Sequence, residues 1–164
     1  MKNPEVFLVF APKRTRPYKY NVYDMANNLF LPFAHLEAVC LTREDTKPVI
    51  QEIIERLRDD CPKYDDAHGK PGEHFDWLEA IKLTWKWSVS VIRFPLVGTS
   101  NGIIKLKTVH VVLETDTEYI SGTGRTYDRL YPAKVTANRS EARAYAEPGV
   151  HTIVDHELVG FVPA

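Results

Sequence analysis

Acidic and histidine side chains are concentrated around residues 65–76, where groups that could act as acids, bases or metal ligands are densest. These residues are Asp65, Asp66, His68, Glu73, His74 and Asp76. A carboxylate beside an imidazole can set the histidine tautomer for proton transfer, and oxygen and imidazole ligands are typical of hydrolytic metal sites. Asp66 and His68 are therefore candidate catalytic residues of a small metal-dependent hydrolase or nuclease. The alternative is a solvated loop that leads into a helix, because Asp and Gly form turns and acidic residues favour the first helical turn.

The spacing of these groups matches no established motif. No H-E-x-x-H, H-x-H or paired carboxylate at helical spacing occurs, and no G-x-S-x-G or Cys–His nucleophile signature is visible. We therefore predict no metal site and no cofactor.

His110 is the strongest single candidate for a catalytic base. It lies in an alternating segment, 103–115, in which Ile104, Leu106 and Val112 would share its face. If those residues point inward, His110 does too, and a hydrogen-bonded core histidine is the favoured interpretation. A catalytic role requires a cleft and a carboxylate partner, which Glu114 or Asp155 could supply.

The segment 12–23, PKRTRPYKYNVY, is the best candidate for a binding surface. Its candidate residues are Arg14, Arg16, Tyr18, Lys19 and Tyr20. Basic side chains contact phosphates and tyrosines stack on unpaired bases, but the same composition also suits an acidic protein surface. A solvated loop whose tyrosines pack on the core is the third interpretation.

A helix predicted over 73–87 supplies a second candidate surface. Its buried stripe consists of Phe75, Leu78, Ile81 and Trp85. Trp77 and Trp87 lie off that stripe, so we expect at least one of them to be partly exposed or covered by a different element, which is either the rest of this fold or a partner. An exposed tryptophan would indicate an interface, and a homodimer is one alternative.

Length and composition indicate one globular domain, 1–164. The net charge of −1 argues against a protein held to nucleic acid by bulk charge alone. Cys40 and Cys61 stand in no metal or redox spacing, and we expect two reduced thiols. No apolar run has the length of a membrane helix and no signal peptide is visible, so we expect a cytoplasmic protein.

Hydrophobic periodicity predicts an α+β fold, with two main helices on one face of a largely antiparallel sheet of about five or six strands. The apolar run 6–10 predicts a strand buried on both faces. Segments 88–97, 103–115 and 117–121 predict a meander whose first turn contains Asn101-Gly102. The remaining predictions are strands at 36–41 and 150–162, an irregular segment at 126–136 and a short helix at 24–29. A helix around 49–57 has an apolar stripe and Thr42 or Asp45 as its cap, and a further short helix follows Asn138, which with Glu141 has the spacing of a capping box.

Function is predicted only as a class. A compact chain without enzyme motifs favours a small soluble binding or regulatory module that contacts a protein or a protein–nucleic-acid machine. Accessory and inhibitor proteins of phage or plasmid type are of this kind. The alternatives are the hydrolase or nuclease described above, and a nucleic-acid-binding protein that uses the basic-aromatic segment. We expect a protein partner, and no enzymatic activity unless His110, Asp66 or His68 meets the geometry of a catalytic site.

Overall fold

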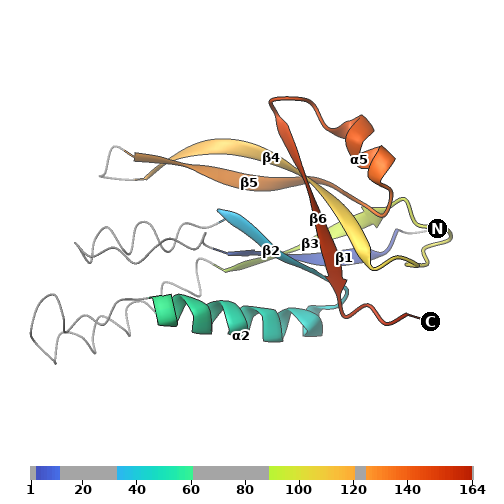
Figure 1. Cartoon of the computed structure of the whole chain (residues 1–164), viewed down its shortest axis with the longest axis horizontal. Coiled ribbons are helices and arrows are strands. Elements are labelled where there is room, and N and C mark those ends of the chain that lie inside the picture. Colours follow the sequence, from blue (N-terminus) through green and yellow to red (C-terminus); the bar gives the residue numbers. More distant parts are fainter. Residues whose placement is uncertain (1–2, 12–32, 61–88, 121–124, 164) are drawn as a thin grey trace, which may run out of the picture.

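Six strands in the order β1-β2-β6-β4-β5-β3 form a mixed sheet that closes into a barrel. The computed structural model describes residues 3–11, 33–60, 89–120 and 125–163, which form a single domain (Figure 1). The strands are β1 (Glu5–Ala11), β2 (His35–Cys40), β3 (Ser90–Val97), β4 (Thr108–Ile120), β5 (Arg125–Thr136) and β6 (His151–Val159). The described residues contain two helices, α2 (Arg43–Asp60) and α5 (Arg139–Tyr145).

The barrel closes through two short parallel contacts. β1 pairs antiparallel with β2 and β3, and β4 pairs antiparallel with β5 and β6. These two antiparallel halves meet where β2 runs parallel to β6 and β3 runs parallel to β5, over two residue pairs each. The predicted largely antiparallel sheet of about five or six strands is therefore confirmed for most strand pairs, whereas its closure into a barrel was not predicted.

Strand β1 is buried on both faces, as its continuous apolar sequence predicts. Val6, Leu8 and Phe10 belong to the core inside the barrel. Val9 and Ala11 belong to a second core cluster with Ile53 of α2. The two clusters explain why β1 shows no polar alternation, because a helix covers the face that water would otherwise contact.

Helix α2 forms where its stripe and cap predict it. Val49, Ile50 and Ile54 pack around Ile53 against the outer face of the sheet. Thr42 and Asp45 cap the first turn reciprocally, since the Asp45 amide donates to Thr42 Oγ1 and the Thr42 amide donates to Asp45 Oδ2. The predicted helix over 73–87 and the short helix over 24–29 lie outside the described residues.

The two described helices do not share one face of the sheet. Helix α2 packs on β1 and β2, whereas α5 packs on β4 and β5. Figure 1 shows them on opposite sides of the molecule. The prediction that both main helices lie on one face concerned 73–87, so the described residues do not test it for that segment.

The predicted meander is wrong in its connectivity. Asn101 and Gly102 do form a tight turn, with φ of 56° and 71° and a hydrogen bond from the Ile103 amide to the Ser100 carbonyl. However, β3 pairs with β1 and β5, not with β4. The segments predicted as two strands, 103–115 and 117–121, become one strand that starts at Thr108.

Strand β5 occupies the segment predicted to be irregular. Pro132 hid the strand pattern, because proline cannot donate to a strand ladder. The structure accommodates it at a bulge: Val112 pairs with Lys134 and Leu113 pairs with Pro132, so Ala133 is the extra residue.

The described part of the chain contains no helix long and apolar enough to cross a bilayer.

Candidate functional site

His110 is the one predicted catalytic residue that the described part of the chain contains. The other candidates lie outside the described residues and stay predictions: Asp66, His68, Arg14, Arg16, Tyr18, Lys19, Tyr20, Trp77 and Trp87. Among the residues that the structure describes, no three His, Cys, Asp or Glu side chains are grouped to hold a metal ion. The candidate site is therefore built from His110 outward.

The side chain of His110 lies on the outer face of the barrel, which corrects the prediction that it points inward. Val109, Val111 and Leu113 fill the interior, so the residues that alternate with them point outward. The prediction failed because Leu106 precedes the first residue of β4 and is 62% exposed. A residue outside the strand does not indicate which residues of the strand point inward and which point outward.

Asp155 is the carboxylate partner of His110. It is one of the two partners predicted from the sequence, the other being Glu114. The two residues face each other across the antiparallel β4–β6 pair, and Nδ1 of His110 lies 2.6 Å from Oδ1 of Asp155. The His110 side chain is only 12% exposed, whereas that of Asp155 is 44% exposed. An ionised carboxylate only accepts hydrogen bonds, so the proton sits on Nδ1, and Nε2 of the neutral imidazole is an acceptor.

The surroundings of Asp155 keep its carboxylate ionised. The hydrogen bond from His110 is the main cause that lowers the pKa of Asp155 below its ordinary value, and electrostatic interactions with His110, Arg139 and Arg143 add to it. Both arginines come from α5, which contacts β4 and β5. The aspartate is therefore fitted to orient the imidazole rather than to take its proton.

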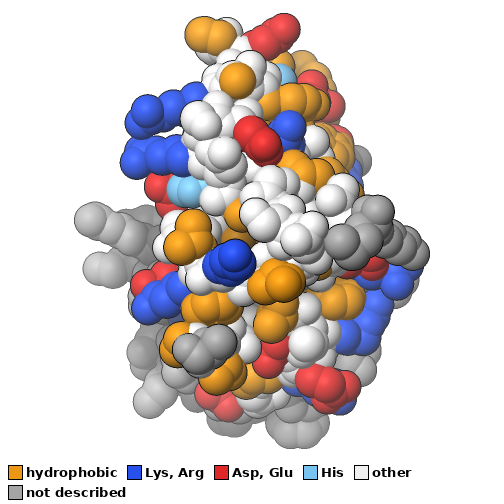
Figure 2. Space-filling view, turned by 90° about the vertical axis from the view of Figure 1, so that its right-hand side faces the viewer, with side chains coloured by type: hydrophobic (Ala, Val, Ile, Leu, Met, Phe, Trp, Pro, Cys, Tyr) orange, Lys and Arg blue, Asp and Glu red, His pale blue; other side chains and the backbone are white. Residues whose placement is uncertain are grey.

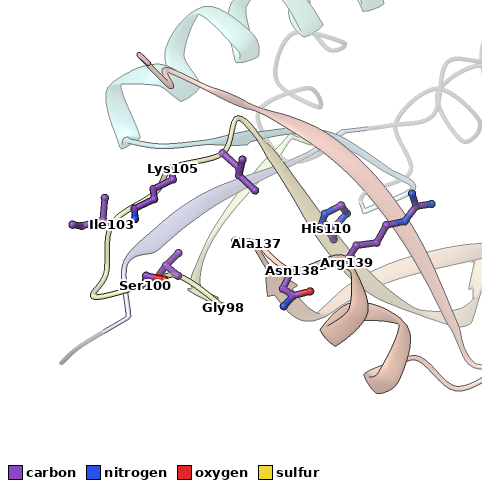
Figure 3. A pocket seen from close by; sticks show the side chains of 10 residues that line it. Gly98, Ser100, Ile103, Lys105, His110, Ala137, Asn138 and Arg139 are labelled. Carbon is purple, nitrogen blue, oxygen red and sulfur yellow. The ribbon is translucent and has the colours of Figure 1, made fainter. Parts of the chain in front are cut away.

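His110 lines a pocket of about 600 Å³ between the β3–β4 connection and the start of α5. Figure 3 shows Ser100, Ile103 and Lys105 on one wall and His110, Asn138 and Arg139 on the other. The pocket is lined by Gly98, Thr99, Ser100, Ile103, Lys105, Leu106, His110, Ala137, Asn138 and Arg139. His110 therefore has both a carboxylate partner and a cleft, which a catalytic histidine requires.

The charge of the pocket wall is positive. Lys105 and Arg139 line it, whereas the carboxylates of Asp155 and Glu141 lie next to the lining residues His110 and Gly98. Within the described ranges, neither cation has an ion-pair partner, whereas the neighbouring Lys107 is paired with Glu157 at 3.1 Å. Figure 2 views this end of the molecule and shows basic, acidic and hydrophobic side chains around uncharged surface. The pocket is therefore suited to an anionic group.

Uncharged polar groups add to the hydrogen-bonding capacity of the pocket. The hydroxyl oxygen of Thr99 is buried and has no hydrogen-bond partner among the described residues. A buried hydroxyl without a partner costs free energy, typically about 1–3 kcal/mol.

A network around Thr136 fixes α5 relative to the end of β3. The Thr136 hydroxyl donates to Glu141 Oε2 at 2.9 Å and accepts from the Asn138 amide at 3.0 Å. Asn138 in turn caps the helix through the Ser140 amide, as predicted. Gly98 approaches this network closely, with φ of +77°, so that a Cβ there would lie 2.7 Å from Thr136 Oγ1. The network places Asn138 and Arg139 at the pocket.

A second ionic cluster lies on the bulge of β2. Ala38 pairs with Val9 and Leu36 pairs with Phe10, so Glu37 is the extra residue of the bulge. Arg56 of α2 binds both carboxylate oxygens of Glu37, at 2.8 and 3.0 Å, and this hydrogen bonding lowers the pKa of Glu37. His156 lies nearby, and burial lowers its pKa. The contacts of Glu37 link α2 to β2, which is a structural role.

Comparison with protein-family models, with curated proteins and with solved structures found no match to this chain. Sequence reasoning missed Thr99, Lys105 and Arg139 as pocket residues. The available signals were the Asn101-Gly102 turn and the Asn138 cap, which mark the two segments that form the walls, but nothing local in the sequence brings those segments together.

Proposed function

We propose that the protein is a binding module that holds an anionic group, a phosphate or a carboxylate, in the His110 pocket. One observation carries this proposal: Lys105 and Arg139 line the pocket and form no ion pair within 4.0 Å in the described part of the chain, while the nearest carboxylates, those of Asp155 and Glu141, accept hydrogen bonds from His110 and Thr136. A cation that contributes to no internal pair is available to a ligand, and charge-assisted hydrogen bonds are about twice as strong as neutral ones.

The other pocket residues support the same assignment. Ser100, Asn138 and Thr99 carry groups that can donate hydrogen bonds to the oxygens of an anion. Ile103 is 57% exposed and Leu106 is 62% exposed, so an apolar surface adjoins the cationic one. A ligand with an anionic group and an apolar body would match both parts.

An NMR titration of the full chain with inorganic phosphate and with acetate tests the proposal. We expect amide shifts confined to residues 98–106, 110 and 137–139. Replacing Lys105 or Arg139 with glutamine should weaken phosphate binding by roughly tenfold, since each removes one charged hydrogen bond.

Two matched controls separate the pocket from general surface charge. Lys107→Gln lies on the same connection as Lys105 but removes a lysine that is already paired with Glu157. Arg143→Gln lies one helical turn beyond Arg139 and does not line the pocket. Equal weakening by all four variants, or shifts spread over the whole surface, would show that phosphate binds only as a screening ion.

We propose a macromolecular partner, with a protein as the first candidate. The basic-aromatic segment and Trp77 or Trp87 are proposed contact surfaces, with homodimerisation as an alternative. A pull-down with wild type and with the Tyr18→Ala/Tyr20→Ala variant tests this, followed by identification of any protein that only wild type retains. A partner retained equally by both proteins would contradict a role for these tyrosines.

A further inference from the structure

We propose that the Asn101-Gly102 turn is a site of spontaneous covalent modification, in which the side-chain amide of Asn101 is converted to an acid through a succinimide. The turn adjoins the pocket, because Ser100 and Ile103 on either side of it both line the pocket wall. The modification therefore changes that wall with time. The modification itself does not depend on the proposed function, whereas its effect on anion binding rests on it.

The side chain of Asn101 is accessible and makes no internal contact that would hold it in place. Asn101 and Gly102 are both exposed in the connection between β3 and β4. Figure 3 shows this connection as a loop that passes Ser100 and Ile103. Within the described residues, neither the Asn101 side chain nor the Gly102 amide makes a hydrogen bond. The carboxamide can therefore rotate toward the amide nitrogen that follows it.

Gly102 supplies the attacking nitrogen and leaves room for the attack. An asparagine side chain places its carbonyl carbon within ring-closing reach of the main-chain nitrogen of the next residue. A side chain on that next residue crowds the approach, whereas glycine has no Cβ. Gly102 is the only glycine in the chain that follows an asparagine. The sequence and the turn together therefore single out Asn101.

The reaction balances with water as the only co-reactant. The Gly102 nitrogen loses its proton to water or hydroxide and forms a bond to Cγ of Asn101. The bond from Cγ to Nδ2 breaks, and Nδ2 takes a proton and leaves as ammonia. Water then opens the succinimide at Cγ, which gives aspartate, or at the main-chain carbonyl, which gives isoaspartate. The net change is the uptake of water and the release of ammonia.

Asn138 is an exposed asparagine that lines the same pocket but is restrained. Its Oδ1 atom accepts hydrogen bonds from the Ser140 amide at 3.0 Å and from the Ser140 hydroxyl at 2.7 Å. These bonds direct the carboxamide toward Ser140 and away from the nitrogen of Arg139, which is the first residue of α5. Asn138 is thus an internal control that differs from Asn101 in restraint and in the residue that follows.

Either product changes the pocket wall. Aspartate adds a negative charge to the connection that carries Lys105. Isoaspartate adds the same charge and one further main-chain carbon, inside a turn that is closed by a 3.0 Å hydrogen bond from the Ile103 amide to the Ser100 carbonyl. That carbon displaces Ser100 relative to Ile103. We therefore expect both products to weaken the binding of an anion.

Peptide mapping by mass spectrometry, after the full chain has been kept in warm neutral buffer for several weeks, tests the modification. The peptide that contains Asn101 should gain the mass difference between an amide and an acid at least roughly tenfold faster than the peptide that contains Asn138. Electron-transfer fragmentation then separates isoaspartate from aspartate. An Asn101 that stays intact, or that converts no faster than Asn138, would overturn the proposal.

Titration with inorganic phosphate, before and after this incubation, measures the effect on the pocket. The loss of binding should follow the extent of conversion. Asn101→Asp should weaken phosphate binding without any incubation, by roughly twofold to fivefold, which is the range for interactions between exposed charges. Asn101→Gly accepts the positive φ of this position and has no amide to lose, so its binding should not change with age.

The outcomes for the two proposals are distinct. Fresh wild-type protein that does not bind phosphate would overturn the proposed function, while the mass measurement still decides the modification. Conversion of Asn101 with unchanged phosphate binding would overturn the effect on the pocket. An equal loss of binding with age in Asn101→Gly and in wild type would overturn it as well, since the cause would then lie elsewhere in the chain.

Discussion

The Nδ1 atom of His110 on β4 lies 2.6 Å from the Oδ1 atom of Asp155 on β6, across an antiparallel strand pair. The two residues are 45 positions apart in the sequence and are brought together by strand register alone. The pair occupies the outer face of the barrel, beside α5, where His110 is nearly buried and still lines a pocket. The contact with Asp155 fixes the orientation of the His110 imidazole in the pocket.

Titration of Asp155 tests the pair directly. We expect the carboxyl group of Asp155 to titrate below the ordinary aspartate value of about 4 in wild type, and closer to it in His110→Gln. The pKa is lower in the folded chain than in the unfolded one. The pair therefore stabilises the fold above pH 4 or so, and this contribution is lost as the pH falls through the lowered pKa. Carboxyl-carbon NMR measures the midpoint, and equal midpoints in both proteins would contradict the pairing.

The Glu37–Arg56 contact should contribute to stability in a pH-dependent way. Glu37→Gln is expected to lower the free energy of unfolding at pH 7 by about 1–3 kcal/mol, because both partners are mostly buried and the contact is bidentate. The pKa of Glu37 is lowered, so the difference from wild type should shrink as the pH falls through that value. Urea unfolding at several pH values measures it.

Glu52→Gln is the matched control for the Glu37 variant, because Glu52 lies exposed on α2. It should change the free energy of unfolding by less than about 0.5 kcal/mol. A Glu37 effect that is the same at neutral and acid pH would refute an ionic origin of the stabilisation.

Gly98 should tolerate alanine less well than Gly149. Both have positive φ, 77° and 83°, so alanine at either position costs about 1 kcal/mol in backbone strain. At Gly98 the new Cβ would also lie 2.7 Å from Thr136 Oγ1, whereas at Gly149 it meets nothing within 4 Å. We expect Gly98→Ala to lose about 1–3 kcal/mol more than Gly149→Ala in urea unfolding. Equal losses of unfolding free energy in the two variants would mean that Thr136 and its hydrogen-bond partners shift to make room for the methyl group at little cost.

The thiol of Cys40 should be unreactive in the folded protein. Cys40 is free and buried in the layer between the barrel and α2, and burial, together with the charge of Asp45, raises its pKa to about 11. In a Cys61→Ser background, Ellman's reagent at pH 8 should react with Cys40 only as fast as the protein unfolds. Rapid reaction without denaturant would contradict this burial.

Local sequence patterns predicted the elements whose stability is mostly local. The apolar run of β1, the apolar stripe of α2 and the Asn138 cap of α5 all occur where the residues indicate, and Thr42 and Asp45, predicted as alternative caps of α2, cap it together. Where tertiary structure resolves a local conflict, the prediction failed. Pro132 is compatible with β5 because a bulge in the β4–β5 pairing accommodates it, and no local sequence pattern predicts that bulge.

The sequence by itself thus determined which segments become strands or helices in most of the described chain, and that His110 required a carboxylate and a cleft. Only the tertiary structure decided the strand neighbours, the closure of the barrel, the outward direction of His110 and the choice of Asp155 over Glu114. The physical reason is that periodicity reports which faces of a segment are apolar, whereas pairing and register depend on contacts between segments far apart in the chain. The cationic pocket arises in the same way, from two walls joined by the Thr136 network.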